Sequence, residues 1–458
     1  MAEAKADVPH HAPNPLSASR SRSLSGHVGV PGDKSISHRA LLFGALATGR
    51  TRVTGLLEGQ DVLGTAKVLQ ALGCPISKAG DTWEVLGRGV GGLAAPAGEL
   101  DFGNSGTGVR LMMGVLAGHD LKARLVGDAS LSRRPMGRVL RPLQRMGLEV
   151  VDRGKETLPL TIRGTPDLIP IEYQLPVPSA QIKSAVLIAG LHAAGETTVI
   201  EPESTRDHTE RMLAHFGAQI AATKRQGLRA ISVRGDAELV GQEVHVPGDP
   251  SSAAFLAAAA LIVPGSEVTI RDVLINPTRT GFYTTLREMG ADIAFLGERG
   301  QGGEPVADIR VRHSRLKGVH VPAARAPSMI DEYPVLACLS AYAEGETHME
   351  GLGELKVKES DRLAATAEGL LANGVPVKVE GDTMIVGGGR EVPGGGVVAT
   401  HLDHRIAMAF LVLGLGTDRP VTVDDASMIA TSFPEFQPLL GQMGASFAAP
   451  ERQGTASS

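Results

Sequence analysis

The feature that most constrains the fold is a phrase of the form Leu-x-x-x-Gly-x-x-apolar, which occurs six times. Its glycines recur about every seventy residues, at Gly73, Gly147, Gly217, Gly290, Gly374 and Gly444. Amphipathic spacing precedes each glycine and alternation follows it, so we expect a helix that ends in a left-handed residue, and then a strand. Phrases rich in β-branched residues stand upstream of each, at 51–59, 123–130, 197–204, 267–274, 346–354 and 420–427. A strand–helix–strand unit is therefore predicted six times.

Further helices are predicted between these units. The segments 180–191, 252–262 and 405–415 are each about three turns long and almost wholly apolar. A helix that is apolar on all sides is expected to be buried.

Two similar segments divide the six units into two sets of three. Val30-Pro31-Gly32-Asp33-Lys34-Ser35 is echoed by Val-Pro-Gly-Asp-Pro-Ser at 246–251. If the chain passes between domains at both, residues 32–247 form domain II, and residues 24–31 with 248–450 form domain I. Residues 1–23 and 451–458 are expected to be a flexible lead-in and tail. A ligand would then bind in the interdomain cleft; a tandem solenoid without a cleft is the alternative.

Composition narrows the class of protein. The 458 residues are 42% hydrophobic, with 45 basic and 50 acidic residues, one Trp and four Tyr. Nucleic acid is an unexpected partner, because a basic face with stacking residues is missing. No apolar run approaches the ~18 residues of a membrane span. Cys74 and Cys338 lie far apart in apolar segments, and the first 23 residues lack the apolar core of a secretory signal. We therefore expect free buried thiols and a cytoplasmic location.

The first twin segment is predicted to be an anion site. Pro31 and Gly32 form a turn, and the apolar run after Arg39 indicates a helix that begins near Ser35. Unpaired N–H groups at a helix start, together with Lys34, Ser35 and Arg39, suit a phosphate. An ordinary capped helix with surface charges is the alternative.

Three other stretches place small polar residues before an apolar helix, at 103–108 (GNSGTG), 179–184 (SAQIKS, with Ser179 as N-cap) and 401–405 (HLDHR). Each alone is typical of a capped helix. Several helix starts aimed at one cleft would attract a polyanion, although the formal net charge of the chain is −5.

Two charged stretches could supply proton transfer. Lys358 and Arg362 are four residues apart on a helix face, with Glu359 beside them. Two cations could hold a phosphate or carboxylate while Glu359 transfers a proton, although neighbouring cations lower the pKa of a glutamate. Asp331 has mostly apolar neighbours in the sequence, and it could accept a hydrogen bond from a substrate hydroxyl. A solvated helix start is the alternative for 356–362.

Other chemistries lack their motifs. His401 and His404 have no third histidine or cysteine at ligand spacing nearby, so no metal is expected. The sequence has no Walker loop, no GxSxG elbow and no strand-linked GxGxxG with a downstream acid.

The motifs PGDKSISHRALL, GNSGTG, SRRPMG, SAQIKSAVLIAG, LKVKESDRLAA and LDHRIAMAF, in this order across nearly the full chain, resemble the 5-enolpyruvylshikimate-3-phosphate synthase family. The resemblance implies an α/β fold with two similar domains, each of three βαβαββ repeats in an inside-out barrel. The implied activity transfers the enolpyruvyl group of phosphoenolpyruvate to the 5-hydroxyl of shikimate 3-phosphate and releases phosphate. It implies no cofactor and no metal, a monomer, and glyphosate as an inhibitor.

The resemblance also implies roles for individual residues. The shikimate 3-phosphate contacts would be Lys34, Ser35, Arg39, Ser179, Ala180, Gln181, Arg206, Asp331 and Lys358. The phosphoenolpyruvate contacts would be Lys34, Asn104, Gly106, Arg134, Gln181, Lys358, Glu359, Arg362 and Arg405. Asp331 would accept the proton of the attacking hydroxyl, and Glu359 would protonate and then deprotonate the methylene carbon. Lys34 is the rival for proton transfer.

The sequence departs from the better-known branch of this family at three positions. Ser105 stands for an alanine, Leu111 for a proline and Thr431 for a lysine that would contact phosphoenolpyruvate. These features resemble the second, often glyphosate-tolerant class. Gly106 stands where the most tolerant members carry an alanine, so only partial tolerance is expected.

Two rival functions share this fold. A UDP-N-acetylglucosamine enolpyruvyl transferase would carry a reactive cysteine in a glycine-rich loop, and Cys74 and Cys338 occupy no such place. The presence of Lys34, Asp331, Lys358 and Glu359 together argues against a non-catalytic phosphosugar-binding protein.

Overall fold

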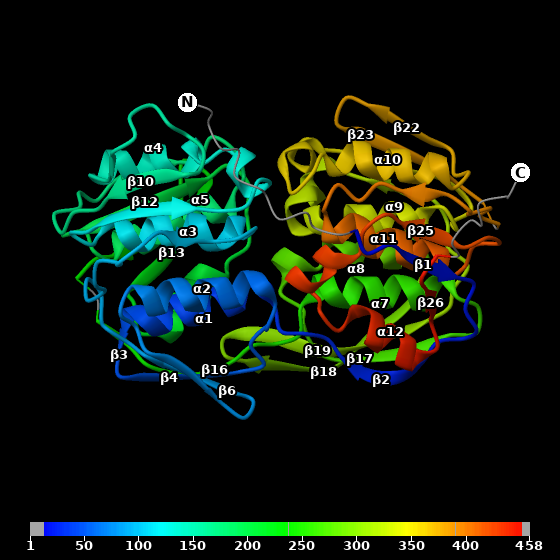
Figure 1. The fold of residues 1–458 in the computed structure, drawn as a ribbon, viewed down its shortest axis with the longest axis horizontal. Coiled ribbons are helices and arrows are strands. Elements are labelled where there is room, and N and C mark those ends of the chain that lie inside the picture. Colours follow the sequence, from blue (N-terminus) through cyan, green and yellow to red (C-terminus); the bar gives the residue numbers. More distant parts are fainter. Residues whose placement is uncertain (1–12, 237, 390, 451–458) are drawn as a thin grey trace, which may run out of the picture.

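The computed structural model describes residues 13–236, 238–389 and 391–450. The chain folds into two lobes that lie side by side (Figure 1). We call residues 32–247 the first lobe, and residues 13–31 with 248–450 the second lobe. Each lobe has its own hydrophobic core, one built from residues between 36 and 246 with Leu274, the other from residues 16–24 and 253–443.

The described part of the first lobe contains three four-stranded sheets, whose strands follow in spatial order. They are β16 (Glu243–His245), β4 (Arg50–Thr54), β6 (Thr82–Leu86) and β5 (Ile76–Ala79); β7 (Leu100–Asp101), β8 (Lys122–Val126), β10 (Leu160–Arg163) and β9 (Glu149–Val150); and β11 (Glu172–Gln174), β12 (Glu196–Glu201), β14 (Leu228–Arg234) and β13 (Ile220–Arg225). A short parallel pair adds β3 (Ala47–Thr48) and β15 (Leu239–Val240).

The second lobe, over its described ranges, contains three more four-stranded sheets. They are β2 (Ser25–Gly29), β17 (Glu267–Leu274), β19 (Glu304–Arg312) and β18 (Asp292–Gln301); β20 (His320–Val321), β21 (Gly345–Met349), β23 (Thr383–Gly388) and β22 (Val377–Glu380); and β24 (Val397–Val398), β25 (Val421–Val423), β1 (Leu16–Ser19) and β26 (Ser446–Ala448).

All six sheets follow one pattern. The first strand runs parallel to the second, and the other two are antiparallel to their neighbours, as in Glu243↔Arg52, Arg52↔Glu84 and Ser77↔Glu84 of the first sheet. The sheet of β24, β25, β1 and β26 repeats this order with strands from both ends of the described chain. The predicted α/β fold of two lobes with three repeats each is confirmed.

Strand β1 corrects the expectation for the lead-in. The sequence predicts a flexible segment over residues 1–23, but Leu16–Ser19 pairs with β25 and β26, and Leu16 and Ala18 are buried in the second core. The four-residue strand LSAS is too short to show its alternation in the sequence, and its partners lie about 400 residues away. Residues 1–12 and the tail 451–458 lie outside the described residues.

Two kinds of helix fill the described part of each lobe. Six are almost wholly buried, namely α1 (Lys34–Leu46), α3 (Gly106–Ala117), α5 (Ala180–Gly190), α7 (Pro250–Ile262), α9 (Tyr333–Ser340) and α11 (His404–Gly414). Six keep an exposed side, namely α2 (Gln60–Ala71), α4 (Gly137–Met146), α6 (His208–His215), α8 (Gly281–Glu288), α10 (Arg362–Ala372) and α12 (Phe436–Met443). In Figure 1, β4 and β6 and the strands β17–β19 lie at the lower edge of the lobes, with α1, α2 and α7 above them.

The six repeat glycines all have a positive φ, from 77° at Gly374 to 123° at Gly147. Each follows one of the six partly exposed helices and precedes the strand of the same unit. This confirms the predicted left-handed helix ends, a conformation in which a residue with a Cβ is disfavoured.

Short 3₁₀ helices complete the described fold, at Leu131–Arg133 (η1), Pro277–Arg279 (η2), Ala323–Ser328 (η3), Ile330–Glu332 (η4), Gly353–Val357 (η5) and Ser427–Thr431 (η6). Within the described ranges, none of the helices combines the length and apolar character that a membrane crossing requires.

The chain crosses between the lobes at the two twin segments. Gly32 and Gly248 form an antiparallel bridge, in which Asp33 N donates to Pro247 O (2.7 Å) and Asp249 N donates to Pro31 O (2.9 Å). At each crossing, the first strand of a unit in one lobe (β2 or β16) is followed by a buried helix of the other lobe (α1 or α7). The two crossings are therefore hydrogen-bonded to each other.

Candidate active site

A cavity of about 490 Å³ lies between the lobes, with walls from both. Twelve of the fifteen predicted site residues line it: Lys34, Ser35, Gly106, Arg134, Ser179, Ala180, Gln181, Arg206, Asp331, Lys358, Glu359 and Arg405. Segments that are up to about 370 residues apart in the chain thus meet at one place.

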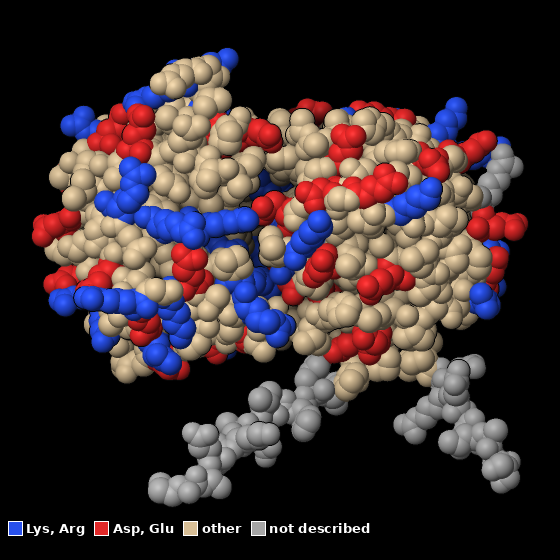
Figure 2. Space-filling view, turned by 90° about the horizontal axis from the view of Figure 1, so that it is seen from above, with Lys and Arg blue, Asp and Glu red and all other residues tan. Residues whose placement is uncertain are grey.

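Helix starts form much of the cavity wall. The first residues of α1, α3, α5 and α11 line it, and each of these helices is capped by the side chain of the preceding residue: Asp33, Ser105, Ser179 and Asp403. Such ends attract anions. Eight cationic side chains and six carboxylates line the cavity, and Lys and Arg side chains gather along the hollow between the lobes (Figure 2). The cavity is therefore suited to polyanions, as predicted.

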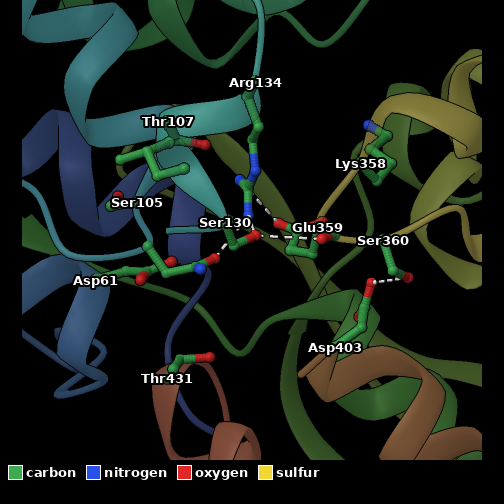
Figure 3. Close-up of polar contacts among 12 residues, drawn as sticks. Asp61, Ser105, Thr107, Ser130, Arg134, Lys358, Glu359, Ser360, Asp403 and Thr431 are labelled. Carbon is green, nitrogen blue, oxygen red and sulfur yellow. Dashed lines mark hydrogen bonds and ion pairs between the residues drawn. The ribbon is translucent and has the colours of Figure 1, made fainter. Parts of the chain in front are cut away.

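Glu359 is held from both lobes (Figure 3). Arg134 Nη1 lies 3.4 Å from Glu359 Oε1, and Ser130 Oγ donates to the Glu359 backbone oxygen at 3.2 Å. Arg362 Nη2 lies 2.5 Å from Glu359 Oε2. Burial would raise the pKa of Glu359, but Arg362 and Arg134 outweigh it and hold that pKa well below its ordinary value.

Asp331 lies at the centre of a group of cations. Arg206 Nη2 of the first lobe is 2.7 Å from Asp331 Oδ2, and Arg362 Nη1 and Lys358 Nζ are 3.2 and 3.8 Å from Oδ1. Arg405 Nη1 donates to the Asp331 backbone oxygen at 3.1 Å. Burial would raise the pKa of Asp331, but Arg405, Lys358 and Arg206 hold it well below its ordinary value. Asp331 is therefore ionised near neutral pH.

Lys34 extends from the first residue of α1 to Asp61, at the start of α2, and both line the cavity. Nearby, burial and then Lys34 lower the pKa of His404 to about 3, so its imidazole is neutral. Burial also lowers the pKa of Lys358, although Asp331 opposes the shift. Among the described residues, Lys34 and Lys358 are thus the two lysines that reach this cavity, one from each lobe.

Gln181 joins α5 to α3. Its Oε1 accepts from Arg110 Nη1 (2.7 Å), and its Nε2 donates to Thr107 (3.0 Å). Burial and the nearby charge of Arg134 together lower the pKa of Arg110 to about 10. Gly106 lies beside these groups, because a Cβ on it would be 2.9 Å from Arg134 Nη1 and 3.3 Å from Arg110 Nη1. The glycine allows two guanidinium groups to approach the start of α3.

Three predicted residues do not reach the cavity wall. Arg39 is 3% exposed and donates to Thr209, Ser184 and the Ser35 backbone oxygen. Arg362 is engaged by Asp403, Asp331 and Glu359. Asn104 accepts from Arg134 Nη2 at 2.6 Å and donates to Asp128. In this structure all three support other site residues; direct substrate contacts by them stay predictions.

Several residues of the site carry no specific signal in the sequence. Arg110 follows GNSGTG inside an apolar helix, and Asp61 begins an ordinary amphipathic one. Asp403 stands out only as part of HLDHR, yet it caps α11 and accepts from Ser360 (3.0 Å) and Arg362 Nε (2.8 Å). Arg138 of the first lobe and Glu354 of the second form an ion pair of 3.1 Å at the cavity wall. These roles depend on contacts that are distant in sequence.

One group of potential metal ligands exists among the described residues, and it lies outside the cavity. Asp207, His208 and Glu304 have ligand atoms within 4.8 Å of one another. Asn276 donates to both carboxylates, and Arg211 lies 2.9 Å from Asp207 and 3.7 Å from Glu304. Since these donors already engage the carboxylate oxygens, the group is better described as a contact between the lobes.

Comparison with known proteins identifies the family. The family model described as "EPSP synthase (3-phosphoshikimate 1-carboxyvinyltransferase)" matches residues 19–440. The chain belongs to the EPSP synthase family. It is 60% identical over 441 residues to the 3-phosphoshikimate 1-carboxyvinyltransferase of Parvibaculum lavamentivorans (96% of this chain, 98% of the relative). It is 58% identical over 437 residues to that of a Pseudomonas species (94% and 97%).

Solved structures agree with this family. An EPSP synthase from Acinetobacter baumannii matches with a TM-score of 0.84 and 44% identity, covering 95% of this chain and 99% of the other. The enolpyruvyl transferase NikO from Streptomyces tendae shares the fold, with a TM-score of 0.74 at 18% identity over 95% and 99% of the two chains. The family suggested by the motifs is therefore confirmed.

Proposed function

We propose that the cavity is the active site of a 3-phosphoshikimate 1-carboxyvinyltransferase, which joins phosphoenolpyruvate to the 5-hydroxyl of shikimate 3-phosphate and releases phosphate. One observation supports this most strongly. Asp331 and Glu359 are bridged by the buried Arg362, and each is also held by an arginine of the first lobe. Two carboxylates at fixed positions among cations suit two different proton transfers between anionic substrates.

Shikimate 3-phosphate is assigned to the side of the cavity formed by α1 and α5. The N–H groups of Ala180 and Gln181, the hydroxyls of Ser35 and Ser179, and the Arg206 guanidinium suit its phosphate and carboxylate. Lys34 would contact both substrates. Arg39 would support Ser35 from below, through its hydrogen bond to the Ser35 backbone oxygen.

Phosphoenolpyruvate is assigned to the opposite side. Arg134, Lys358 and Arg405 supply cations there, and Gln181 and Gly106 complete the wall. Thr431 (Figure 3) stands where the better-known branch would carry a lysine. It belongs to η6, which contacts α2. The Thr431 Oγ1 donates to the Met428 backbone oxygen at 2.7 Å. The residues of η6, all of which the structure describes, are Ser, Met, Ile, Ala and Thr, so this segment contributes no cation.

The reaction then needs proton transfers at two places, the attacking oxygen and the methylene carbon C3. The 5-hydroxyl gives its proton to Asp331 while its oxygen bonds to C2 of phosphoenolpyruvate, and C3 gains a proton from Glu359. The tetrahedral intermediate loses phosphate as its C–O bond breaks and Glu359 takes a proton back from C3. The leaving phosphate carries away the proton that Asp331 accepted, so both carboxyl groups return to their starting protonation states. Because Arg134 and Arg362 lower the pKa of free Glu359, we expect the bound substrate anions to offset them and raise it.

The test is phosphate release from phosphoenolpyruvate with shikimate 3-phosphate as acceptor. We expect Glu359→Gln to lower kcat by about 10²–10⁴-fold. Glu354→Gln is the matched control, because Glu354 lines the same cavity but makes only a half-exposed ion pair with Arg138. An inactive wild type would contradict the function, and near-normal turnover by Glu359→Gln would contradict this role.

The same assay distinguishes the proposed function from that of the rival UDP-N-acetylglucosamine enolpyruvyl transferase. Cys74 and Cys338 are free and buried, and neither lines the cavity. Burial raises the pKa of Cys74 to about 11, which disfavours a reactive thiolate. Phosphate release with UDP-N-acetylglucosamine, and none with shikimate 3-phosphate, would favour the rival.

Glyphosate is proposed to bind beside Gly106 with partial tolerance. The methyl of Gly106→Ala would lie 2.9 Å from Arg134 Nη1, the end of a long side chain and not backbone, so the variant should fold but hold the larger inhibitor less well. We expect the inhibitory concentration of glyphosate to rise more than the KM of phosphoenolpyruvate. Unchanged glyphosate inhibition would contradict this site.

We also propose the domain boundaries, the cellular location and the oligomeric state. We assign domain I to residues 24–31 and 248–450, extended by β1, and domain II to residues 32–247. A cytoplasmic monomer fits the two separate cores and the free thiols. Light scattering after gel filtration tests the oligomeric state.

A further inference from the structure

Arg279 lies where the two crossing segments meet. It is the last residue of η2 in the second lobe, and its side chain is 2% exposed. Arg279 Nη1 lies 2.6 Å from Asp33 Oδ2, and Arg279 Nη2 lies 3.1 Å from Asp249 Oδ1. One guanidinium thus joins the aspartates of both Pro-Gly-Asp turns.

Asp33 connects Arg279 to the start of α1. While its Oδ2 binds Arg279, its Oδ1 accepts from the Ile36 backbone N–H at 2.8 Å and caps the helix. Lys34 follows Asp33 directly and is the first residue of α1. A change in the Asp33 side chain would therefore move the base of the Lys34 side chain.

Asp249 holds Lys34 from the other lobe. Its Oδ2 accepts from the Lys34 backbone N–H at 3.3 Å, and its Oδ1 accepts from Ser251 N at 2.7 Å. The position of Lys34 is therefore determined by two carboxylates, one from each lobe, and both depend on Arg279.

Arg279 also reaches the segment of Asp331. Its Nη2 donates to Ser251 Oγ at 3.1 Å, and Ser251 Oγ donates in turn to Glu332. Glu332 directly follows Asp331 and is buried. The guanidinium therefore stands between the two residues that compete for the first proton transfer.

We propose that Arg279 is a positioning residue, which fixes Lys34 relative to Asp331 across the two lobes. Arg279 lies at the cavity wall, but both of its Nη atoms are engaged by Asp33, Asp249 and Ser251, so it acts through these partners and not on the substrate. The backbone pair at Gly32 and Gly248 keeps the crossings together, while Arg279 sets the direction in which α1 presents Lys34. The inference rests on the proposed function, since turnover is one of its readouts.

The first experiment compares Arg279→Met with a matched control, His208→Gln. His208 of the first lobe contacts Glu304 of the second at 2.8 Å, is equally buried, and is not among the cavity residues. We expect Arg279→Met to lower kcat on the order of tenfold or more with little change in either KM. His208→Gln should lower the midpoint of urea unfolding and leave kcat within about twofold.

Two further variants separate charge from position. Arg279→Met leaves Asp33 and Asp249 without their shared cation, which destabilises the fold. Asp249→Asn in the Arg279→Met background removes one of the two charges, so it should raise the unfolding midpoint but leave kcat low. Arg279→Lys keeps one cation and should recover part of kcat. If Arg279→Met does not fold, the kcat values of these two variants test the positioning role.

Three results would overturn the inference. A raised KM with normal kcat would make Arg279 a substrate-binding residue. Equal kcat losses in Arg279→Met and His208→Gln would make its role merely structural. Full recovery of kcat in the double variant would show that Arg279 acts only by balancing the charges of the two aspartates. Failure of the proposed function is a separate result, namely a wild type that releases no phosphate.

Discussion

The two crossing segments, 30–35 and 246–251, are nearly the same in sequence and in structure. Both contain Pro-Gly-Asp, both lead from a strand of one lobe to a buried helix of the other, and in both the aspartate caps that helix. In the other four units, the first strand is followed by a buried helix of its own lobe. The turn therefore serves the exchange between lobes.

The segments differ at the residue after the aspartate. Lys34 extends its side chain into the cavity and contacts Asp61, whereas Pro250 occupies the first position of α7 and is buried. Proline suits that position because its missing N–H would have no intrahelical partner. One turn geometry can thus be used twice, with the catalytic charge added at only one copy.

The largest expected effect separates the two copies by activity. We expect Lys34→Ala to lower kcat by about 10³-fold, because a cation that contacts both substrates is lost. Pro250→Ala, the matched change in the other segment, should alter stability by about 1 kcal/mol or less and leave kcat normal. Steady-state phosphate release and urea unfolding check both. Near-normal turnover by Lys34→Ala, or loss of its cooperative unfolding, would break the division of roles.

The second effect tests the turn geometry itself. A Cβ on Gly32 would lie 1.9 Å from the Gly55 backbone oxygen, whereas on Gly248 the nearest atom is a side-chain carbon of Val30 at 2.8 Å. Backbone cannot move aside as a side chain can, so Gly32→Ala should cost about 3 kcal/mol or more and Gly248→Ala about 1–2 kcal/mol. Urea unfolding measures both. Equal losses would show that the two turns are equally tight.

The smallest effect concerns acid. Burial would raise the pKa of Asp33, but Arg279, His208 and the Ile36 N–H together lower it to about 2 from 3.8. Because the folded-state pKa is lowered, this stabilisation is complete above about pH 4 and is lost as the pH falls towards 2. Asp33 should thus contribute about 2 kcal/mol at neutral pH.

Urea unfolding of wild type and Asp33→Asn between pH 5 and pH 2.5 measures this contribution. The difference in unfolding free energy between the two proteins should shrink as the pH falls, because asparagine does not titrate. A constant difference would mean that the Asp33–Arg279 pair contributes nothing that depends on the Asp33 charge.

Much of the secondary structure could be predicted from local sequence patterns. The glycines after each amphipathic helix, the cap at Ser179, and the apolar helices between units follow from backbone sterics and hydrophobic spacing within a few residues. Strand β1 was missed because four residues carry too little pattern, and its pairing with β25 and β26 is a long-range contact. The contacts of Arg39 with Thr209 and of Arg362 with Asp403 could not be read from the sequence for a related reason, since these partners come from other segments of the chain.

By itself, the sequence determined the six units, their two sets of three, the family and twelve of the residues that line the cavity. Only the tertiary structure decided which charges meet: Arg362 between Asp331 and Glu359, Asp61 on Lys34, and Arg279 between the two turns. Secondary structure depends on neighbours in the chain. The position and pKa of a buried charge depend on groups brought close by folding, and several of those lie well outside the local sequence, such as Asp33, which is 246 residues from Arg279.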